Sequence, residues 1–264
     1  MITAQQKPLL YGNNLTYKIS EKVIINDVSI ALNSGELVTI IGPNGAGKSS
    51  LLRLLTGYTT PTQGECYFKD KLYSQWNSQK LAKNRAVMRQ NSQLSFSFSV
   101  EDVVAMGRTP HGQQNKQIAI ETALLLTDCI KLKDRDFRQL SGGEQQRVQL
   151  ARVLAQLWHP QAEKSALFLD EPTSALDLYH QQQSLRLLKK LTKTQDLMVC
   201  CVLHDLNLAA LYADRILLLH QGKLVCEGTP ANVLTTENIE KWYGADVNVN
   251  QHPEHSQPQV FLKP

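Results

Sequence analysis

The stretch Leu37-Val-Thr-Ile-Ile-Gly42-Pro-Asn-Gly-Ala-Gly-Lys48-Ser49 decides the fold of this chain. Its first five residues are an apolar run that only Thr39 interrupts, which predicts a strand buried on both faces of a parallel sheet. Residues 49–56 then have a helical pattern that Gly57 closes. The residues from Gly42 to Ser49 match GxxxxGK[ST], a loop whose backbone N–H groups surround phosphate. Strand, loop and helix in this order predict an α/β fold that binds a nucleotide at the carboxyl end of the strand.

The glycines of this loop let the backbone fold tightly around an anion, and the helix N-terminus adds a positive dipole end. We expect Lys48 to reach the β- and γ-phosphates of a nucleotide and the Ser49 hydroxyl to bind Mg²⁺. The alternative is a glycine-rich turn with an incidental lysine, and the flanking strand and helix argue against it. The predicted nucleotide-binding residues are Gly42, Pro43, Asn44, Gly45, Ala46, Gly47, Lys48, Ser49 and Ser50.

Two carboxylates follow a second apolar run. The sequence Leu167-Phe-Leu-Asp170-Glu171 places them at the end of a buried strand, where ligands bind in open α/β sheets. We expect Asp170 to hold Mg²⁺, directly or through water, and Glu171 to act as general base on the attacking water. An acidic pair that merely ends a strand is the alternative. The phosphate loop upstream favours the catalytic interpretation.

A second pair of glycines predicts another anion site. Ser141-Gly-Gly-Glu-Gln145 precedes a helical pattern over residues 145–157. Glycines allow close backbone approach, and the free N–H groups at the start of a helix attract an anion. Because the loop at residues 42–49 already accounts for the phosphates of one nucleotide, this site suggests a second subunit, although spacing alone does not show it.

Three single residues are more ambiguous. His204 ends the apolar run 197–203, a third expected parallel strand, and would lie at the same sheet edge as Asp170. Isolated histidines more often have a structural role, but this place favours function. Gln90 at a strand end is ordinary, and Tyr17 could either stack on adenine or pack in its sheet.

Turn and capping residues predict the other elements. Ser99-Val-Glu-Asp102 resembles a capping box that opens a helix, and Gly107 closes it. Residues 91–160 carry mainly helical patterns, which predicts a helical insert in the α/β core. The part after Trp242 has no interpretable pattern. Strands are expected at 15–19, 23–25, 28–32, around 64–72 and at 166–169, helices at 118–129 and 178–191, and a hairpin at 216–227 around Gln221-Gly222.

Composition excludes several classes of function. The 264 residues are 42% hydrophobic and 20% charged, and a formal net charge of +4 without a basic run argues against nucleic acid as a partner. Five cysteines without CxxC spacing favour reduced thiols over a disulfide framework or a zinc site. The N-terminus is too weakly apolar for a signal peptide, and every apolar run is strand-sized. We therefore expect any role at a membrane to require a partner.

Taken together, the motifs resemble those of the ATP-binding subunits of ATP-binding-cassette (ABC) transporters. Leu140-Ser-Gly-Gly-Glu-Gln145 is similar to the family signature and Ser174-Ala-Leu-Asp177 to its D-loop, within a likeness that covers residues 9–243. The site residues that the resemblance implies are Gln90 as a metal-binding and catalytic residue beside Glu171, His204 as switch histidine, Tyr17 stacked on adenine, Asp177 in the D-loop, and Ser141, Gly142, Gly143, Glu144 and Gln145 facing the ATP of a second subunit.

The resemblance also implies an architecture and partners. It makes residues 1–264 one ABC ATP-binding domain with a parallel core sheet, an N-terminal antiparallel β subdomain and a helical signature subdomain at about 91–160. The implied cofactors are ATP and Mg²⁺. A head-to-tail homodimer would hold two ATP molecules and drive two transmembrane permease subunits through a groove beside Gln90. The protein would be peripheral, at the cytoplasmic face of the bacterial inner membrane.

A narrower resemblance is to the haemin importer ATPases of Gram-negative bacteria, which implies haemin as cargo and a periplasmic haem-binding protein as a further partner. Met88-Arg89 stands where many relatives have a proline before the glutamine. The stretches that carry this resemblance are 86–90, 94–100, 103–108, 171–180 and 200–210.

Several alternatives stay open on the sequence. The same motor could serve ferric siderophore or cobalamin import, whereas a soluble ABC ATPase of DNA repair or translation usually needs a coiled-coil insert or a second cassette. A regulator without turnover is disfavoured by the intact Glu171 and His204. His252 and His255 in the tail are better explained by solvent exposure than by haem ligation. Residues such as Phe96 belong either to a docking surface or to the core.

Overall fold

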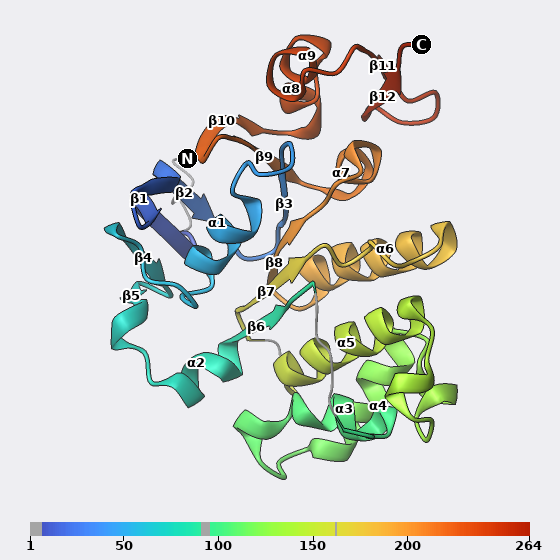
Figure 1. Ribbon diagram of the computed structural model, residues 1–264. Helices are drawn as coiled ribbons and strands as arrows, with labels where there is room; N and C mark the ends of the chain where they lie inside the picture. Colours follow the sequence, from blue (N-terminus) through green and yellow to red (C-terminus); the bar gives the residue numbers. More distant parts are fainter. Residues whose placement is uncertain (1–6, 91–95, 162) are drawn as a thin grey trace, which may run out of the picture.

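The computed structural model describes residues 7–90, 96–161 and 163–264. Its central sheet has six strands in the order β10-β9-β3-β8-β7-β6, and all neighbours are parallel except β10 and β9 (Figure 1). The apolar runs predicted as buried strands are β3, β7 and β8, and the expected hairpin is β9–β10. The strands are β3 (Leu37–Ile41), β6 (Arg85–Met88), β7 (Ser165–Asp170), β8 (Leu197–Val202), β9 (Arg215–His220) and β10 (Lys223–Gly228).

An antiparallel sheet precedes and flanks this core, in the order β2-β1-β4-β5. The expected strand at 15–19 is the second half of β1, whereas the break expected between 23–25 and 28–32 is wrong, because both lie in one continuous strand, β2. Asp27 has a φ of +55° and donates its backbone N–H to the Thr16 hydroxyl at 3.2 Å, so the predicted break is an irregularity inside β2. The strands are β1 (Leu10–Ile19), β2 (Lys22–Leu32), β4 (Gln63–Phe68) and β5 (Lys71–Leu72).

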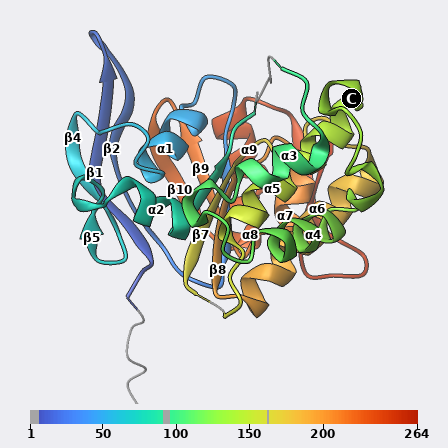
Figure 2. The ribbon, with the colours of Figure 1, turned by 90° about the horizontal axis from the view of Figure 1, so that it is seen from below.

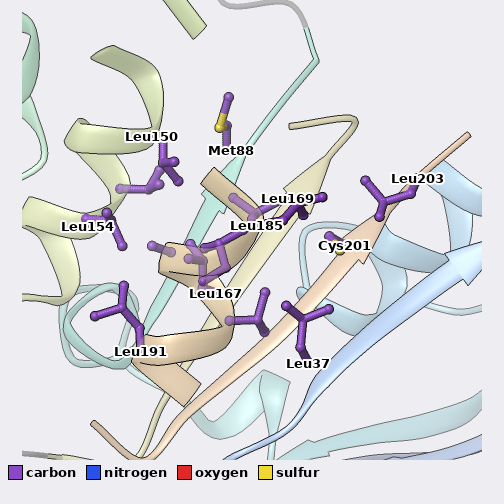
Figure 3. Packing of buried hydrophobic residues seen from close by; sticks show 14 of the residues in the cluster. Leu37, Met88, Leu150, Leu154, Leu167, Leu169, Leu185, Leu191, Cys201 and Leu203 are labelled. Atoms are coloured by element: carbon purple, nitrogen blue, oxygen red, sulfur yellow. The ribbon is translucent and has the colours of Figure 1, made fainter. Parts of the chain in front are cut away.

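Alternate side chains of the central strands build two separate cores. Leu167 and Leu169 of β7 face one cluster, where they meet α5 (Gly142–Leu157) and α6 (Leu178–Thr194) (Figure 3). Ala166 and Phe168 face the other, which contains α1 (Lys48–Leu55) and the antiparallel sheet. This is the period of two that a strand imposes. Because β7 is apolar on both faces, one layer of the fold packs against each face. Figure 2 shows this arrangement from below.

Helices α3, α4 and α5 gather at one end of the molecule (Figure 1). Ser99 forms the expected capping box with Asp102, and Gly107 ends α3. Helix α5 begins at Gly142, three residues earlier than the apolar pattern indicated, because Ser141 caps it. The extent of the insert at 91–160 stays a prediction, since residues 91–95 lie outside the described residues. The helices are α2 (Ser78–Asn84), α3 (Val100–Met106), α4 (Lys116–Leu126) and α5 (Gly142–Leu157), with 3-10 turns at Tyr73–Gln75, Thr109–His111, Ile130–Leu132 and Phe137–Gln139.

The tail that the sequence left without an interpretation forms a two-stranded hairpin against α7. The amide of Asn207 accepts from the Val260 N–H at 2.8 Å and donates to its carbonyl at 3.2 Å. His255 is exposed, and its ring stacks with that of His252 at a centroid distance of 5.1 Å. The elements are α6 (Leu178–Thr194), α7 (Leu206–Tyr212), α8 (Pro230–Val233), α9 (Thr236–Tyr243), β11 (Val247–Gln251) and β12 (Pro258–Leu262).

All five cysteines are free thiols, as the spacing predicted. In the ranges that the structure describes, no helix combines the length and the hydropathy that crossing a bilayer requires. Phe98 packs against the core, whereas Phe96 is 73% exposed. The stretch 94–100, one of those that carry the resemblance to haemin importer ATPases, begins outside the described residues.

Candidate active site

The loop from Gly42 to Gly47 connects β3 to α1 in a conformation that requires glycine. Gly42, Gly45 and Gly47 have φ angles of +147°, +78° and +100°. A Cβ on Gly42 would lie 2.1 Å from the Leu219 carbonyl oxygen. Substitution there would be strained in both backbone and packing. The loop therefore approaches β9 closely and leaves Asn44 and Gly45 exposed at its outer side.

Lys48 is folded onto its own loop. Its ammonium group donates to the carbonyl oxygens of Gly42 at 2.7 Å and Pro43 at 3.0 Å, and the residue is only 7% exposed. Burial lowers the pKa of Lys48, while the nearby carboxylates of Glu171 and Asp170 act in the opposite direction. The ammonium group is thus held at the mouth of the loop, where an anion can replace carbonyl oxygens as its partner.

Ser49 and Asp170 meet across the gap between α1 and β7. The serine hydroxyl donates to the Asp170 carboxylate at 3.1 Å. Burial raises the pKa of Asp170, the Ser49 hydrogen bond opposes this shift, and the neighbouring Glu171 adds to it. Hydroxyl and carboxylate oxygens are ligands that Mg²⁺ prefers, so this pair could hold that cation.

Glu171 lies between two side chains from neighbouring strand ends. Gln90, just after β6, donates its amide to Glu171 Oε2 at 2.6 Å. His204, just after β8, lies with Nε2 2.5 Å from Glu171 Oε1. Glu171 itself has a φ of +55°, an uncommon conformation for a residue with a side chain. Three residues that the sequence proposed for catalysis are therefore in contact, at the carboxyl edge of the parallel sheet.

Ser141 begins helix α5 on the other side of β7. Its backbone N–H donates to the Glu144 carboxylate at 2.8 Å, and its hydroxyl accepts from the Glu144 N–H at 3.3 Å. Ser141 and Gly142 are exposed. Among the residues that the structure describes, no side-chain hydrogen bond or ion pair joins 141–145 to the loop at 42–50. The two predicted anion sites thus stay separate within one chain.

Comparison with known proteins agrees with this arrangement. Residues 25–174 match the family described as ABC transporter. The Hemin import ATP-binding protein HmuV of Escherichia coli O157:H7 is 50% identical over 254 residues, which are 96% of this chain and 99% of that protein. The chain belongs to the ABC transporter family.

Solved structures of ABC proteins share the fold. A metal-chelate type ABC transporter in an inward-facing conformation superposes with a TM-score of 0.80 at 29% identity, covering 97% of this chain and 98% of the other. A dimeric bacterial ABC transporter cassette gives a TM-score of 0.71 at 27% identity, covering 83% and 98%. The expected fold and family are confirmed, and the chain is an ABC-type ATPase.

Tyr17 lies half-buried in β1 of this ABC subunit, opposite Ile25 of β2. It packs at the edge of the core that contains α1. A Cβ built on Gly47 would lie 3.0 Å from Ile25 Cδ1, so this part of the antiparallel sheet borders the phosphate loop. The position is compatible with both expected roles, packing in the sheet and stacking on a base.

The ABC fold leaves a cavity of about 490 Å³ between α1 and β6, and Gln90 lies at its edge. Ser49 and Asp170 line its inner end. At its outer side, the guanidinium of Arg89 lies 4.2 Å from the centroid of the exposed Tyr58 ring. Arginine in this geometry is held by a cation–π contact and stays available to a carboxylate.

Sequence reasoning missed two contacts in this site. Asp177 caps helix α6 by accepting from the His180 N–H, and His180 Nδ1 also lies 2.9 Å from its carboxylate. Gln146 of α5 donates to the Glu171 carbonyl at 2.8 Å and accepts from the Ala175 N–H at 2.9 Å. Asp177 preceding a helical pattern could have indicated the cap. Nothing in the sequence around Gln146 marks its contact.

Proposed function

We propose that this chain is the ATP-hydrolysing subunit of a haemin importer and works as a homodimer on a membrane permease. The assignment of haemin as the cargo rests on the likeness to HmuV along nearly the whole length of both chains. The motor role is supported by the meeting of Glu171, Gln90 and His204 at one edge of the sheet.

In this proposal the loop residues 42–50 bind the phosphates of ATP, with Lys48 moving from its loop carbonyls to the β- and γ-phosphates. Tyr17 stacks on adenine. Ser49, Gln90 and Asp170 would hold Mg²⁺, and the fit is supported by the oxygen atoms of Ser49 and Asp170, which lie 3.1 Å apart. The cation would neutralise charge on the phosphate oxygens as the bond to the leaving group breaks.

Glu171 is proposed to accept the proton of the attacking water. Gln90 directs its amide donor at this carboxylate, and His204 would do the same with a proton on Nε2, so both side chains fix its orientation. Both donors can turn to the γ-phosphate and the water once ATP is present. Their positions at two different strand ends make the arrangement dependent on the spacing of β6 and β8.

The second anion site is proposed to act in trans. Ser141, Gly142, Gly143, Glu144 and Gln145 would contact the ATP bound to the loop of a second copy, and Asp177 would lie at the same interface. The exposure of Ser141 and Gly142 supports this role, as does the lack of a side-chain hydrogen bond or ion pair between them and the described loop 42–50 of their own chain. The dimeric cassette among the similar structures is in keeping with it.

The remaining partners are proposed from the same likeness. Two transmembrane permease subunits would dock at the cavity beside Gln90, where Arg89 and Tyr58 offer a cationic aromatic surface. A periplasmic haem-binding protein would deliver cargo to that permease. The ATPase would then be peripheral, at the cytoplasmic face of the bacterial inner membrane, and would contact neither haem nor nucleic acid.

The test is growth of a host strain whose chromosomal copy carries Glu171→Gln, with haem, a ferric siderophore or cobalamin as the required nutrient. Loss of growth on haem alone is expected. Loss on another nutrient alone would move the cargo to the siderophore or cobalamin alternative. Normal growth on all three would contradict the importer and favour a soluble role.

A further inference from the structure

Gln146 connects the start of helix α5 to the turn that follows β7. The two polar atoms of its side chain bond in opposite senses: Nε2 donates to the Glu171 carbonyl at 2.8 Å, and Oε1 accepts from the Ala175 N–H at 2.9 Å. Nε2 also lies 3.4 Å from the Ser174 hydroxyl. The helix that begins at Ser141 is therefore joined to the strand end that carries Glu171.

The carbonyl oxygen of Glu171 is the centre of this network. Besides Gln146, it accepts from the hydroxyl of Ser174 at 3.2 Å and from the N–H of Ser174 at 3.4 Å. Glu171 has a φ of +55°, which an L-residue keeps only where its surroundings hold it. Because the backbone angles set the direction of the Cα–Cβ bond, contacts on this carbonyl also orient the carboxylate between Gln90 and His204.

The chemistry of the contact requires an amide. A carboxamide can donate to one backbone group and accept from another, as a peptide unit does. Methionine has a similar length but makes neither bond. Glutamate keeps an acceptor for the Ala175 N–H, yet it places a carboxylate oxygen against the Glu171 carbonyl, where both groups are acceptors.

We propose that Gln146 is a positioning residue for Glu171, acting through the backbone of Glu171 and the turn at residues 173–176. A shift of α5 relative to β7 would move the carbonyl of Glu171 and, with it, the carboxylate. The helix whose first residues are proposed to meet the partner's ATP thus also orients the base of its own chain. This inference rests on the proposed role of Glu171.

The test measures steady-state ATP hydrolysis by the full-length chain carrying Gln146→Met or Gln146→Glu. We expect kcat to fall about tenfold or more in both variants, because a misplaced base lowers the rate of the chemical step. We expect KM for ATP to stay within about twofold, since nucleotide contacts are intact. A kcat within about twofold of the parent in both variants would overturn the inference.

Two further measurements separate positioning of the base from damage to α5. Gln146→Met combined with Glu171→Gln should still dimerise with MgATP, because the anion site at Ser141 is unchanged; loss of that dimer would overturn the inference in favour of a role in the signature. Gln149→Met changes another glutamine of α5, a buried one whose side-chain amide has no hydrogen-bond partner among the described residues. That control should keep the parent's kcat.

Failure of the proposed function would look different. In that case Glu171→Gln alone would retain ATP hydrolysis, whatever Gln146 does. Loss of turnover in Glu171→Gln together with normal turnover in both Gln146 variants would leave the proposed function standing and overturn only the inference about Gln146.

Discussion

The phosphate loop and the start of helix α5 have the same physical ingredients but different surroundings. Both combine glycines with the N-terminus of a helix. At the phosphate loop, Lys48 donates to the Gly42 carbonyl, and Ser49 donates to the carboxylate of Asp170, which comes from the end of β7. At α5, Ser141 and Glu144 bond to each other, and Ser141 is exposed.

This difference indicates which half of the proposed ATP site a single chain completes. The loop half contains the residues that we propose to hold a nucleotide, a cation and the attacking water, all at one edge of the sheet. The α5 half offers the N–H groups of a helix start at the exposed Ser141 and Gly142, and among the described residues no side-chain hydrogen bond or ion pair joins residues 141–145 to the loop at 42–50. A second copy, placed head to tail, would supply what each half lacks.

The largest effect is expected from removing the base of the loop half. Glu171→Gln should lower kcat for ATP by about 10²–10⁴-fold, because the amide cannot accept the proton of the attacking water. ATP affinity should stay close to that of the parent, which a fluorescent ATP analogue can report. Turnover near that of the parent would remove Glu171 from the chemistry.

The lysine of the loop should have the next largest effect. Lys48→Ala removes the only side-chain ammonium that the structure places at the loop carbonyls, and we expect turnover to fall by about 10²–10³-fold with weaker ATP binding. Isothermal titration with ATP would measure the affinity. Lys22→Ala, at an exposed position of β2, is the matched control and should behave like the parent.

A substitution at the start of α5 should lower ATP hydrolysis without changing the affinity of the monomer for ATP. Ser141→Arg places a bulky cation where the partner's phosphates are proposed to lie, so we expect hydrolysis to fall about 10²-fold. The affinity of the monomer for ATP should be unchanged, since the side-chain hydrogen bonds of Ser141 in the described residues go to Glu144 of its own cap. Equal loss of both properties would mean that the two anion sites converge within one chain.

A smaller effect is expected on the thermal stability of the nucleotide-free chain when Asp170 is replaced. Burial raises the pKa of Asp170, so the ionised carboxylate is disfavoured in the folded chain and costs stability at neutral pH. Asp170→Asn should therefore raise Tm at pH 7 by about 2–4 °C. The gain should vanish below about pH 3, where the carboxyl is protonated in both states.

The exposed Glu21 offers a control for this shift, because Glu21→Gln changes a carboxylate that is in contact with solvent. Its Tm at pH 7 should equal that of the parent. A Tm for Asp170→Asn at or below that of the parent at pH 7 would show that the hydrogen bond from Ser49 outweighs the cost of burial.

Local features of the two regions could be predicted from the sequence, and their connections could not. The apolar strands β3, β7 and β8 and the capping box at Ser99 depend on neighbouring residues, and the structure confirms them. The continuity of β2 through Asp27 depends on Thr16 of another strand. The link from Gln146 to Glu171 joins residues that only the fold brings together.

The hairpin of β11 and β12 could not be predicted for the same reason, because residues far apart in the sequence hold it. Its hairpin strands have only five residues each, so their own pattern is weak, and the backbone of Val260 is held by Asn207 from α7. Such pairing across 53 residues leaves no signal in the local sequence. The meeting of His204 with Glu171 was predictable, because parallel strands end at the same edge of a sheet, whereas the role of Gln90 beside them was implied only by the family resemblance.

We propose that two copies of the chain complete each other's sites, and the molecular mass of the Glu171→Gln chain in MgATP tests this. Light scattering after size exclusion should show a dimer with MgATP and a monomer without it. Adding Ser141→Arg to the same chain should abolish the dimer. A monomer in MgATP for Glu171→Gln, or a dimer that survives Ser141→Arg, would contradict the account.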